Sequence, residues 1–171
     1  LNINPIATKK QLESIGAKLI YDKEITSISF RGKHADPNSS KGNLLRLRQI
    51  GNTTTLTLKG PERIENNISI RDEHETSVDN INKTIGILEH LNYKKAYESK
   101  KHRQHFTLKD NNNNEIASFE IDDWKFIPVF LEIEAKSIKI MQQVTKQLNL
   151  KIEDGKTGMI CEIYKDEFDQ G

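Results

Sequence analysis

The stretch FLEIEAK, residues 130–136, alternates apolar and charged side chains with a period of two. This period predicts a β-strand on which Glu132 and Glu134 share one face, while the apolar residues between them take the other. Two explanations fit the pattern. The strand either belongs to an antiparallel sheet with one solvated face, or it holds two carboxylates together for a ligand. The other strands of the chain help to distinguish these explanations.

The same alternation recurs elsewhere, so the sequence predicts a sheet with one charged face. The segments that show it are residues 43–50, 53–60, 99–110 and 115–124. The charged face carries Arg46, Arg48, Lys59, Lys101, Arg103, Glu120, Asp122, Glu132 and Glu134. Cations occupy the earlier strands and carboxylates the later ones. A solvated face explains any single strand, but it explains neither this sorting nor the preference for Arg, whose planar guanidinium binds phosphate oxygens in pairs.

The order of the elements predicts an α+β fold with a mainly antiparallel sheet. We predict helices at residues 4–19, 77–93 and 137–150, with Asn4 and Ser137 as caps. Further strands are expected at 67–76 and 159–164, a loop at 31–43, and a hairpin turn at KDNNNNE, residues 109–115. If the sheet closes on itself with the charged face inward, it forms a barrel with a polar lumen and helices outside.

The composition favours one cytoplasmic domain of 171 residues. A formal net charge of +1 and an aromatic content of 6% argue against nucleic-acid binding. Every apolar run is too short to span a membrane. The single cysteine, Cys161, cannot build a disulfide framework and fits a reducing compartment. The five histidines lack metal-ligand spacing, so we expect structural or surface roles for them, although His105 could join the charged face.

A lumen lined by both kinds of charge suits a ligand that carries phosphates together with a metal. Inward cations would bind a polyphosphate directly. Inward carboxylates cannot bind that anion, but they can hold Mg²⁺ or Mn²⁺, which bridges to it.

Five short motifs follow one another at set spacings. They are LRLR at 45–48, LTLKGP at 56–61, RDEHE at 71–75, K-x-R at 101–103 followed by Asp122, and FLEIE at 130–134. In this order they resemble the CYTH family of triphosphate tunnel metalloenzymes, which includes class IV adenylate cyclases and thiamine and inorganic triphosphatases. The resemblance covers nearly the whole chain. It implies a closed eight-stranded antiparallel β-barrel, a tunnel with flanking helices, in a single domain over residues 1–171.

The resemblance also implies roles for the charged residues. Arg46, Arg48, Lys59 and Arg103 would bind the triphosphate, with Lys101 as a weaker candidate, and Lys59 would help to activate the attacking water. Asp122, Glu132 and Glu134 would hold Mg²⁺ or Mn²⁺. Arg71, Glu73 and Glu75 match the central R-x-E-x-E of the family, and either line the tunnel or form an ion-paired structural strand. Glu120 is a further candidate for the tunnel lining.

The sequence departs from the family pattern in three places. The family has an E-x-E-x-K strand before the first helix, whereas this sequence begins Leu1-Asn2, so we expect that strand upstream of Leu1. The segment after the first helix reads KEITSISF, without the usual Asp and Tyr. The closing strand has Met159-Ile160 where Ser-Tyr is usual.

Three functions remain open at this stage. We favour a metal-dependent triphosphatase that acts on inorganic triphosphate, thiamine triphosphate or a nucleotide. A class IV adenylate cyclase, which converts ATP to cyclic AMP and pyrophosphate, would use the same lining. A non-catalytic polyphosphate- or nucleotide-binding module gains weight if the upstream strand is lacking. The expected partner is a small triphosphate, with neither nucleic acid nor membrane involved, and a homodimer is an open alternative.

Overall fold

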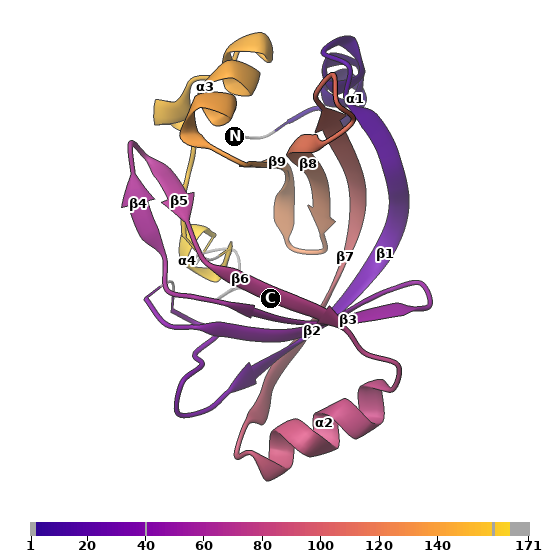
Figure 1. Ribbon diagram of the computed structural model, residues 1–171, viewed down its shortest axis with the longest axis vertical. Helices are drawn as coiled ribbons and strands as arrows, with labels where there is room; N and C mark the ends of the chain where they lie inside the picture. The colour runs from indigo at the N-terminus through magenta and orange to yellow at the C-terminus, as the bar shows by residue number, and fades with distance from the viewer. Residues whose placement is uncertain (1–2, 40, 159, 165–171) are drawn as a thin grey trace. The chain divides into compact units, whose positions relative to one another are not determined.

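A computed structural model describes residues 3–39, 41–158 and 160–164 (Figure 1). The elements are α1 (Pro5–Ser14), β1 (Lys18–Arg31), β2 (Leu44–Ile50), β3 (Thr53–Lys59), β4 (Arg63–Glu65), β5 (Ile68–Ile70), β6 (Glu73–Ser77), α2 (Ile81–His90), β7 (Lys94–Lys109), β8 (Glu115–Trp124), β9 (Ile127–Ala135), α3 (Ile138–Gln147), η1 (Ile152–Asp154) and α4 (Ile160–Ile163). Among these residues, no helix is long and apolar enough to cross a membrane.

The strands form a seven-stranded sheet in the order β6-β3-β2-β1-β7-β8-β9, and β4 and β5 make a separate hairpin. The neighbouring strands β2–β3, β3–β6, β7–β8 and β8–β9 are antiparallel. The prediction of an α+β fold with a large antiparallel sheet is therefore confirmed. The predicted strand at 159–164 is wrong, because Ile160–Ile163 form a helix; Met159 lies outside the described residues.

The chain divides into two compact units. Unit 1 comprises the described residues of Leu1–Lys23 and Lys101–Lys156, and unit 2 those of Glu24–Lys100 and Thr157–Gly171. The single-domain organisation and the closure of the sheet into a tunnel stay predictions. Each unit is described below by itself.

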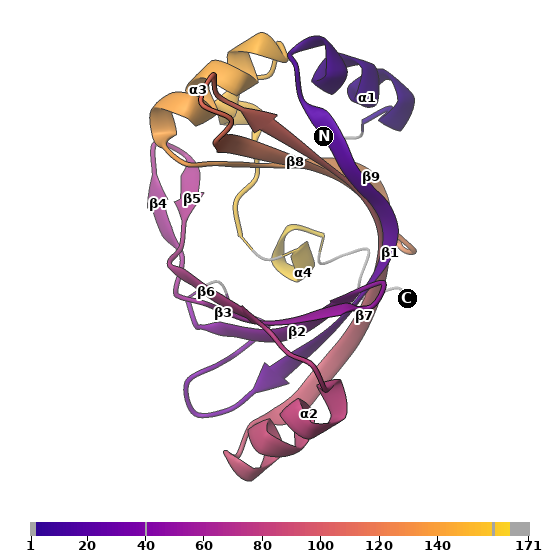
Figure 2. The same cartoon turned by 45° about the vertical axis from the view of Figure 1, so that its right-hand side comes forward.

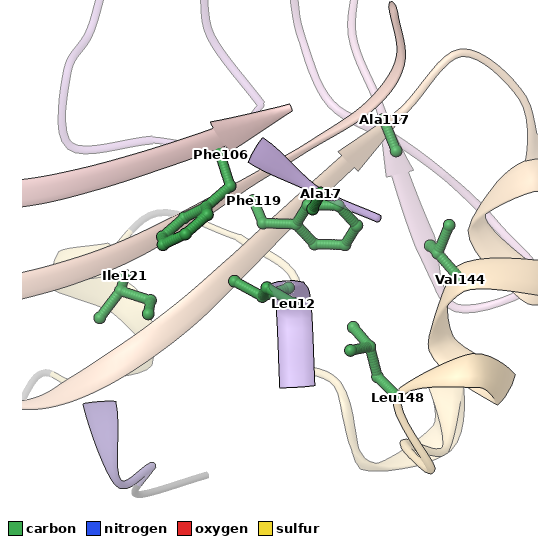
Figure 3. Packing of buried hydrophobic residues seen from close by; sticks show 8 residues of the cluster. All are labelled: Leu12, Ala17, Phe106, Ala117, Phe119, Ile121, Val144 and Leu148. Atoms are coloured by element: carbon green, nitrogen blue, oxygen red, sulfur yellow. The ribbon is translucent and has the colours of Figure 1, made fainter. Parts of the chain in front are cut away.

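Unit 1 places α1 and α3 against the apolar face of β8 and the adjoining strands (Figure 2). Its core consists of Leu12, Ala17, Phe106, Ala117, Phe119, Ile121, Val144 and Leu148 (Figure 3). The caps are as predicted, since Asn4 accepts from the amide of Ala7 at 3.1 Å and Ser137 accepts from that of Ile140 at 3.3 Å.

The first helix is shorter than predicted. It ends at Ser14, because Gly16 adopts a left-handed conformation with a φ of 89°. Leu19 consequently belongs to β1, and Ile6 of the helix is 71% exposed. The predicted hairpin turn is present between β7 and β8, where Asn113 has a φ of 66°.

Unit 2 packs α2 on the apolar face of its strands (Figure 1). The core there consists of Ile28, Phe30, Ala35, Leu45, Leu47, Ile85 and Leu88. The helix begins later than predicted, since Asn80 caps it by accepting from the amide of Lys83 at 2.9 Å and Ser77 belongs to β6. The predicted strand at 67–76 is interrupted at residues 71–72 and becomes β5 and β6.

Candidate functional site: two buried polar faces

The sheet of unit 1 brings the predicted charges of β7, β8 and β9 onto one face. We define the unit 1 polar face as Lys101, Arg103, His105, Glu120, Asp122, Glu132 and Glu134. The antiparallel register pairs Arg103 with Asp122, His105 with Glu120, and Glu120 with Glu132. Because side chains alternate along each strand, these residues project from the side opposite the core that contains Phe106 and Phe119.

Burial excludes a solvated sheet for the centre of this face. The exposed fraction is 4% for Arg103, 3% for Glu120 and 0% for Asp122. Charged residues are almost never so deeply buried unless they are paired. Glu134 differs, because it is exposed. The charges at the centre of this face thus belong to a buried ionic cluster and not to an outer surface.

Asp122 is the anionic centre of this cluster. Its Oδ1 accepts a hydrogen bond from Arg103 Nε at 2.6 Å, and its Oδ2 accepts one from Arg103 Nη2 at the same distance. Lys101 Nζ also donates to Oδ2, at 2.5 Å. Arg103 Nη2 makes a further hydrogen bond to Glu132 Oε2 at 2.9 Å. Two cations and two carboxylates therefore hold one another in fixed positions.

The surroundings shift the pKa values of the two cations, Lys101 and Arg103, in opposite directions. Burial lowers the pKa of Lys101 to about 8, and the charge of Arg103 adds to this, although Asp122 and Glu132 oppose it. Burial also disfavours the charged form of Arg103, but the hydrogen bond with Asp122 and the charge of Glu132 outweigh it and raise the pKa of Arg103. Arg103 is thus a permanent cation, whereas Lys101 can lose its proton in mildly alkaline solution.

The predicted metal ligands lie on one face but do not form a metal site as they stand. Across the part of the chain that the structure describes, no group of three His, Cys, Asp or Glu residues could hold a metal ion. Both oxygens of Asp122 accept from cations, and Glu132 accepts from Arg103. Carboxylate oxygens suit Mg²⁺ and Mn²⁺, but this arrangement would have to change to bind either. The roles of Asp122, Glu132 and Glu134 as ligands remain predictions.

Unit 2 carries a second polar face, centred on Arg46 and Arg48 of β2. Small hydroxyl residues flank them, because the register pairs Arg46 with Ser29 and Thr57, and Arg48 with Ser27 and Thr55. The exposed fractions of Ser29 and Thr57 are 3% and 0%. These hydroxyls of KEITSISF were not among the residues predicted for the site, although this segment departs from the family pattern. The alternation of Ser27 and Ser29 with apolar residues was the available signal.

Arg48 carries a buried hydrogen-bond donor that has no acceptor among the described residues of the chain. Its Nε is buried, and within the described residues no atom accepts a hydrogen bond from it. Leaving a buried donor unsatisfied costs on the order of 1–3 kcal/mol. An anion that accepts from this guanidinium would remove that cost, so the local chemistry fits a bound phosphate oxygen.

The third predicted cation of unit 2, Lys59, forms an ion pair with Glu73 at 3.0 Å. On the same two strands, Thr57 Oγ1 donates to Glu75 Oε2 at 2.7 Å. These contacts support the structural, ion-paired interpretation of the R-x-E-x-E motif. Arg71 lies in the short segment between β5 and β6. The lining roles of Arg71, Glu73 and Glu75 stay predictions.

His105 has a larger part in the unit 1 polar face than the sequence suggested. Its Nδ1 lies 2.8 Å from Glu120 Oε1, and its ring stacks on Tyr21 with centroids 4.9 Å apart and an interplanar angle of 14°. The spacing of two residues from Arg103 was the signal that placed His105 on this face. The pairing with Glu120 could not be read from the sequence, since it depends on the register of β7 and β8.

A CYTH domain model matches residues 3–156. The chain belongs to the CYTH family. Members of this superfamily are triphosphatases or adenylate cyclases and generally depend on a divalent metal, so membership supports an enzyme. None of the curated proteins matches the chain.

Several solved structures are similar to this CYTH chain. The PH1012 protein from Pyrococcus horikoshii OT3 is 25% identical with a TM-score of 0.70, over 91% of this chain and 90% of that one. A candidate adenylate cyclase from Vibrio parahaemolyticus is 16% identical with a TM-score of 0.69, over 97% and 92%. HpAC1 from Hippeastrum, a candidate adenylyl cyclase with a dominant triphosphatase activity, is 12% identical with a TM-score of 0.65, over 96% and 92%. The last two likenesses establish the fold alone.

Proposed function

We propose that this CYTH chain is a triphosphatase that depends on Mg²⁺ or Mn²⁺ and binds its triphosphate through the cations that the sequence predicts for this role. The observation that carries the proposal is the buried Nε of Arg48, which has no acceptor among the described residues and lies between small hydroxyl residues. A guanidinium whose Nε is buried in such surroundings suits a multiply charged anion. A closed tunnel, as in the family, is part of this proposal.

The residues of each face would bind and orient the substrate. Arg46, Arg48 and Lys59 offer cationic donors in unit 2, and Arg103 and Lys101 offer them in unit 1. Phosphoryl transfer requires little covalent chemistry from the protein, so catalysis comes mainly from positioning and from stabilising the negative charge of the transition state. Arg103 suits the second task, because Asp122 and Glu132 fix its guanidinium and it stays charged at any working pH.

A bound divalent metal would neutralise phosphate charge and polarise the terminal phosphoryl group. Glu132 and Glu134 are the candidate ligands on β9, and Glu132 would have to share its carboxylate with Arg103. Asp122 would have to give up hydrogen bonds from Arg103 or Lys101 to join them.

An adenylate cyclase is the second candidate, and a binding module without catalysis is the third. In the cyclase, the 3′-hydroxyl of ATP would attack the α-phosphorus with the same cations around the triphosphate. The similarity to candidate cyclases supports this alternative only at the level of the fold.

The test is to incubate the full chain with inorganic triphosphate, thiamine triphosphate or ATP, with Mg²⁺, Mn²⁺ or EDTA. Metal-dependent release of orthophosphate supports the triphosphatase. Cyclic AMP with pyrophosphate would establish the cyclase instead. Saturable binding without turnover of any of the three substrates would support the non-catalytic binding module.

A further inference from the structure

We propose that His105 and Glu120 form a proton-accepting dyad in which His105 Nε2 is the general base for the attacking water. This inference rests on the proposed triphosphatase function and assigns a residue to the proton transfer of that reaction. It is argued from the pairing, burial and surroundings of the two side chains.

The hydrogen bond with Glu120 determines which ring nitrogen carries the proton. A carboxylate only accepts hydrogen bonds, so Nδ1 of His105 is the donor across the 2.8 Å contact with Oε1. In the neutral ring the other nitrogen, Nε2, then holds a lone pair and can accept a proton. Among the described residues Nε2 makes no hydrogen bond, and the side chain is 19% exposed.

Glu120 is suited to stabilise the protonated ring. It is 3% exposed, and its Oε2 accepts no hydrogen bond within the described part of the chain. The charged groups near it are His105 and Arg103 Nη1, which lies 3.9 Å from Oε1, and Glu132, its cross-strand neighbour on β9. A buried carboxylate in this position accepts from Nδ1 and holds the imidazole in one orientation.

Tyr21 and the strand geometry hold the imidazole in place. The ring of His105 stacks on Tyr21 of β1, and its Nδ1 is tied to β8 through Glu120. Two contacts from different strands restrict rotation about both side-chain torsions. A base oriented by a third group in this way matches the general pattern of acid–base catalysis.

The position of His105 on β7 places the dyad close to Arg103, the cation predicted to bind phosphate. His105 is two residues from Arg103 on the same face, and both approach the same oxygen of Glu120. Lys59, the base that the family resemblance suggests, is instead ion-paired with Glu73. A phosphoryl group bound by Arg103 would therefore have an acceptor nitrogen beside it.

The water oxygen forms a bond to the terminal phosphorus while His105 Nε2 takes one of its protons. The bond from that phosphorus to the bridging oxygen breaks, and the bridging oxygen leaves on the diphosphate with the electron pair. The imidazolium then returns the proton to the leaving diphosphate or to solvent, and orthophosphate is released.

The main test measures steady-state kinetics of His105→Asn with the substrate that the wild type hydrolyses. The Asn amide can still donate to Glu120 but has no acceptor in the place of Nε2. We expect kcat to fall about 100-fold or more while KM changes little, in line with the usual effect of losing a general base. Imidazoles added to His105→Ala should restore turnover, and more basic imidazoles should restore it faster. His102→Asn, on the opposite side of β7 and paired with Asp22, is the control and should leave kcat unchanged.

A second measurement needs no variant. In wild-type protein labelled with ¹⁵N-histidine, the neutral ring of His105 should carry its proton on Nδ1. The other tautomer would overturn the dyad, and so would a His105→Asn enzyme with normal kcat or with only a raised KM. If the dyad is overturned by one of these results but the wild type hydrolyses a substrate, the triphosphatase proposal still stands. A wild type that hydrolyses none of the three substrates overturns both.

Discussion

Arg103 and Asp122 form a bidentate ion pair in the interior of unit 1, with two hydrogen bonds of 2.6 Å between facing residues of β7 and β8. Both side chains are almost completely buried. Breaking a buried pair by removing one charge leaves the other without compensation, which costs more than the net value of the pair. The folded protein therefore depends on Asp122 whether or not this residue ever binds a metal.

We expect Asp122→Asn to lower the free energy of unfolding by about 3–5 kcal/mol, because it removes the bidentate anionic partner of buried Arg103 and the partner of Lys101. Chemical denaturation in EDTA measures this directly. Asp123→Asn is a matched control on the same strand, since Asp123 is exposed and should contribute little. Equal stability of the two variants would contradict the ion-pair account.

Lys101 should make stability depend on pH. Its pKa is lowered from 10.5 in the unfolded chain to about 8 in the folded protein, mainly by burial. Between these values the unfolded state binds more protons, so the free energy of unfolding should rise with pH from about 8 to 10.5. The gain is at most roughly 3 kcal/mol. Denaturation of wild type and Lys101→Gln across this range isolates the effect, and parallel curves would show that it is absent.

Arg48→Met should separate ligand binding from stability. Without ligand, the variant should be about as stable as the wild type, because it removes a buried donor that has no acceptor among the described residues. The rise in Tm that tripolyphosphate gives to the wild type should disappear. Arg31→Met is the control, since the Arg31 side chain is 55% exposed and pairs with Asp36 at the surface. A rise in Tm that persists in Arg48→Met would remove Arg48 from the anion site.

Glu132→Gln and Glu134→Gln should each abolish metal-dependent turnover. Both variants remove a carboxylate oxygen that Mg²⁺ or Mn²⁺ prefers. Titration with Mn²⁺, followed by electron paramagnetic resonance, reports binding independently of activity and should show weaker binding in both. Glu115→Gln, an exposed substitution at the start of β8, is the control. Wild-type rates and Mn²⁺ affinity in the two variants would rule out these residues as ligands.

The strand alternation in the sequence was enough to predict which side chains share a face. The faces of β2, β7, β8 and β9 follow it, because a side-chain period of two leaves no other arrangement once one face is apolar. The helix caps Asn4 and Ser137 also follow from local chemistry, as does the left-handed backbone of Asn113 in the hairpin turn. These features depend only on neighbouring residues.

Features that depend on strand register could not be predicted from the sequence. The ion pair between Arg103 and Asp122 arises because the register places these two residues opposite each other, and their predicted roles in binding phosphate and metal stay predictions. The pairing of His105 with Glu120 has the same origin. The prediction of a strand at 159–164 was wrong because the apolar pattern there is too short to distinguish the period of a strand from that of a helix such as α4.

The most direct test of the central claim is ³¹P NMR of inorganic triphosphate incubated with the full chain and Mg²⁺ or Mn²⁺. The account predicts that the triphosphate signals decline while orthophosphate and pyrophosphate appear in equal amounts, and that Arg48→Met and EDTA both prevent this. Triphosphate signals that stay unchanged in every condition, for the wild type as well as the variant, would contradict it.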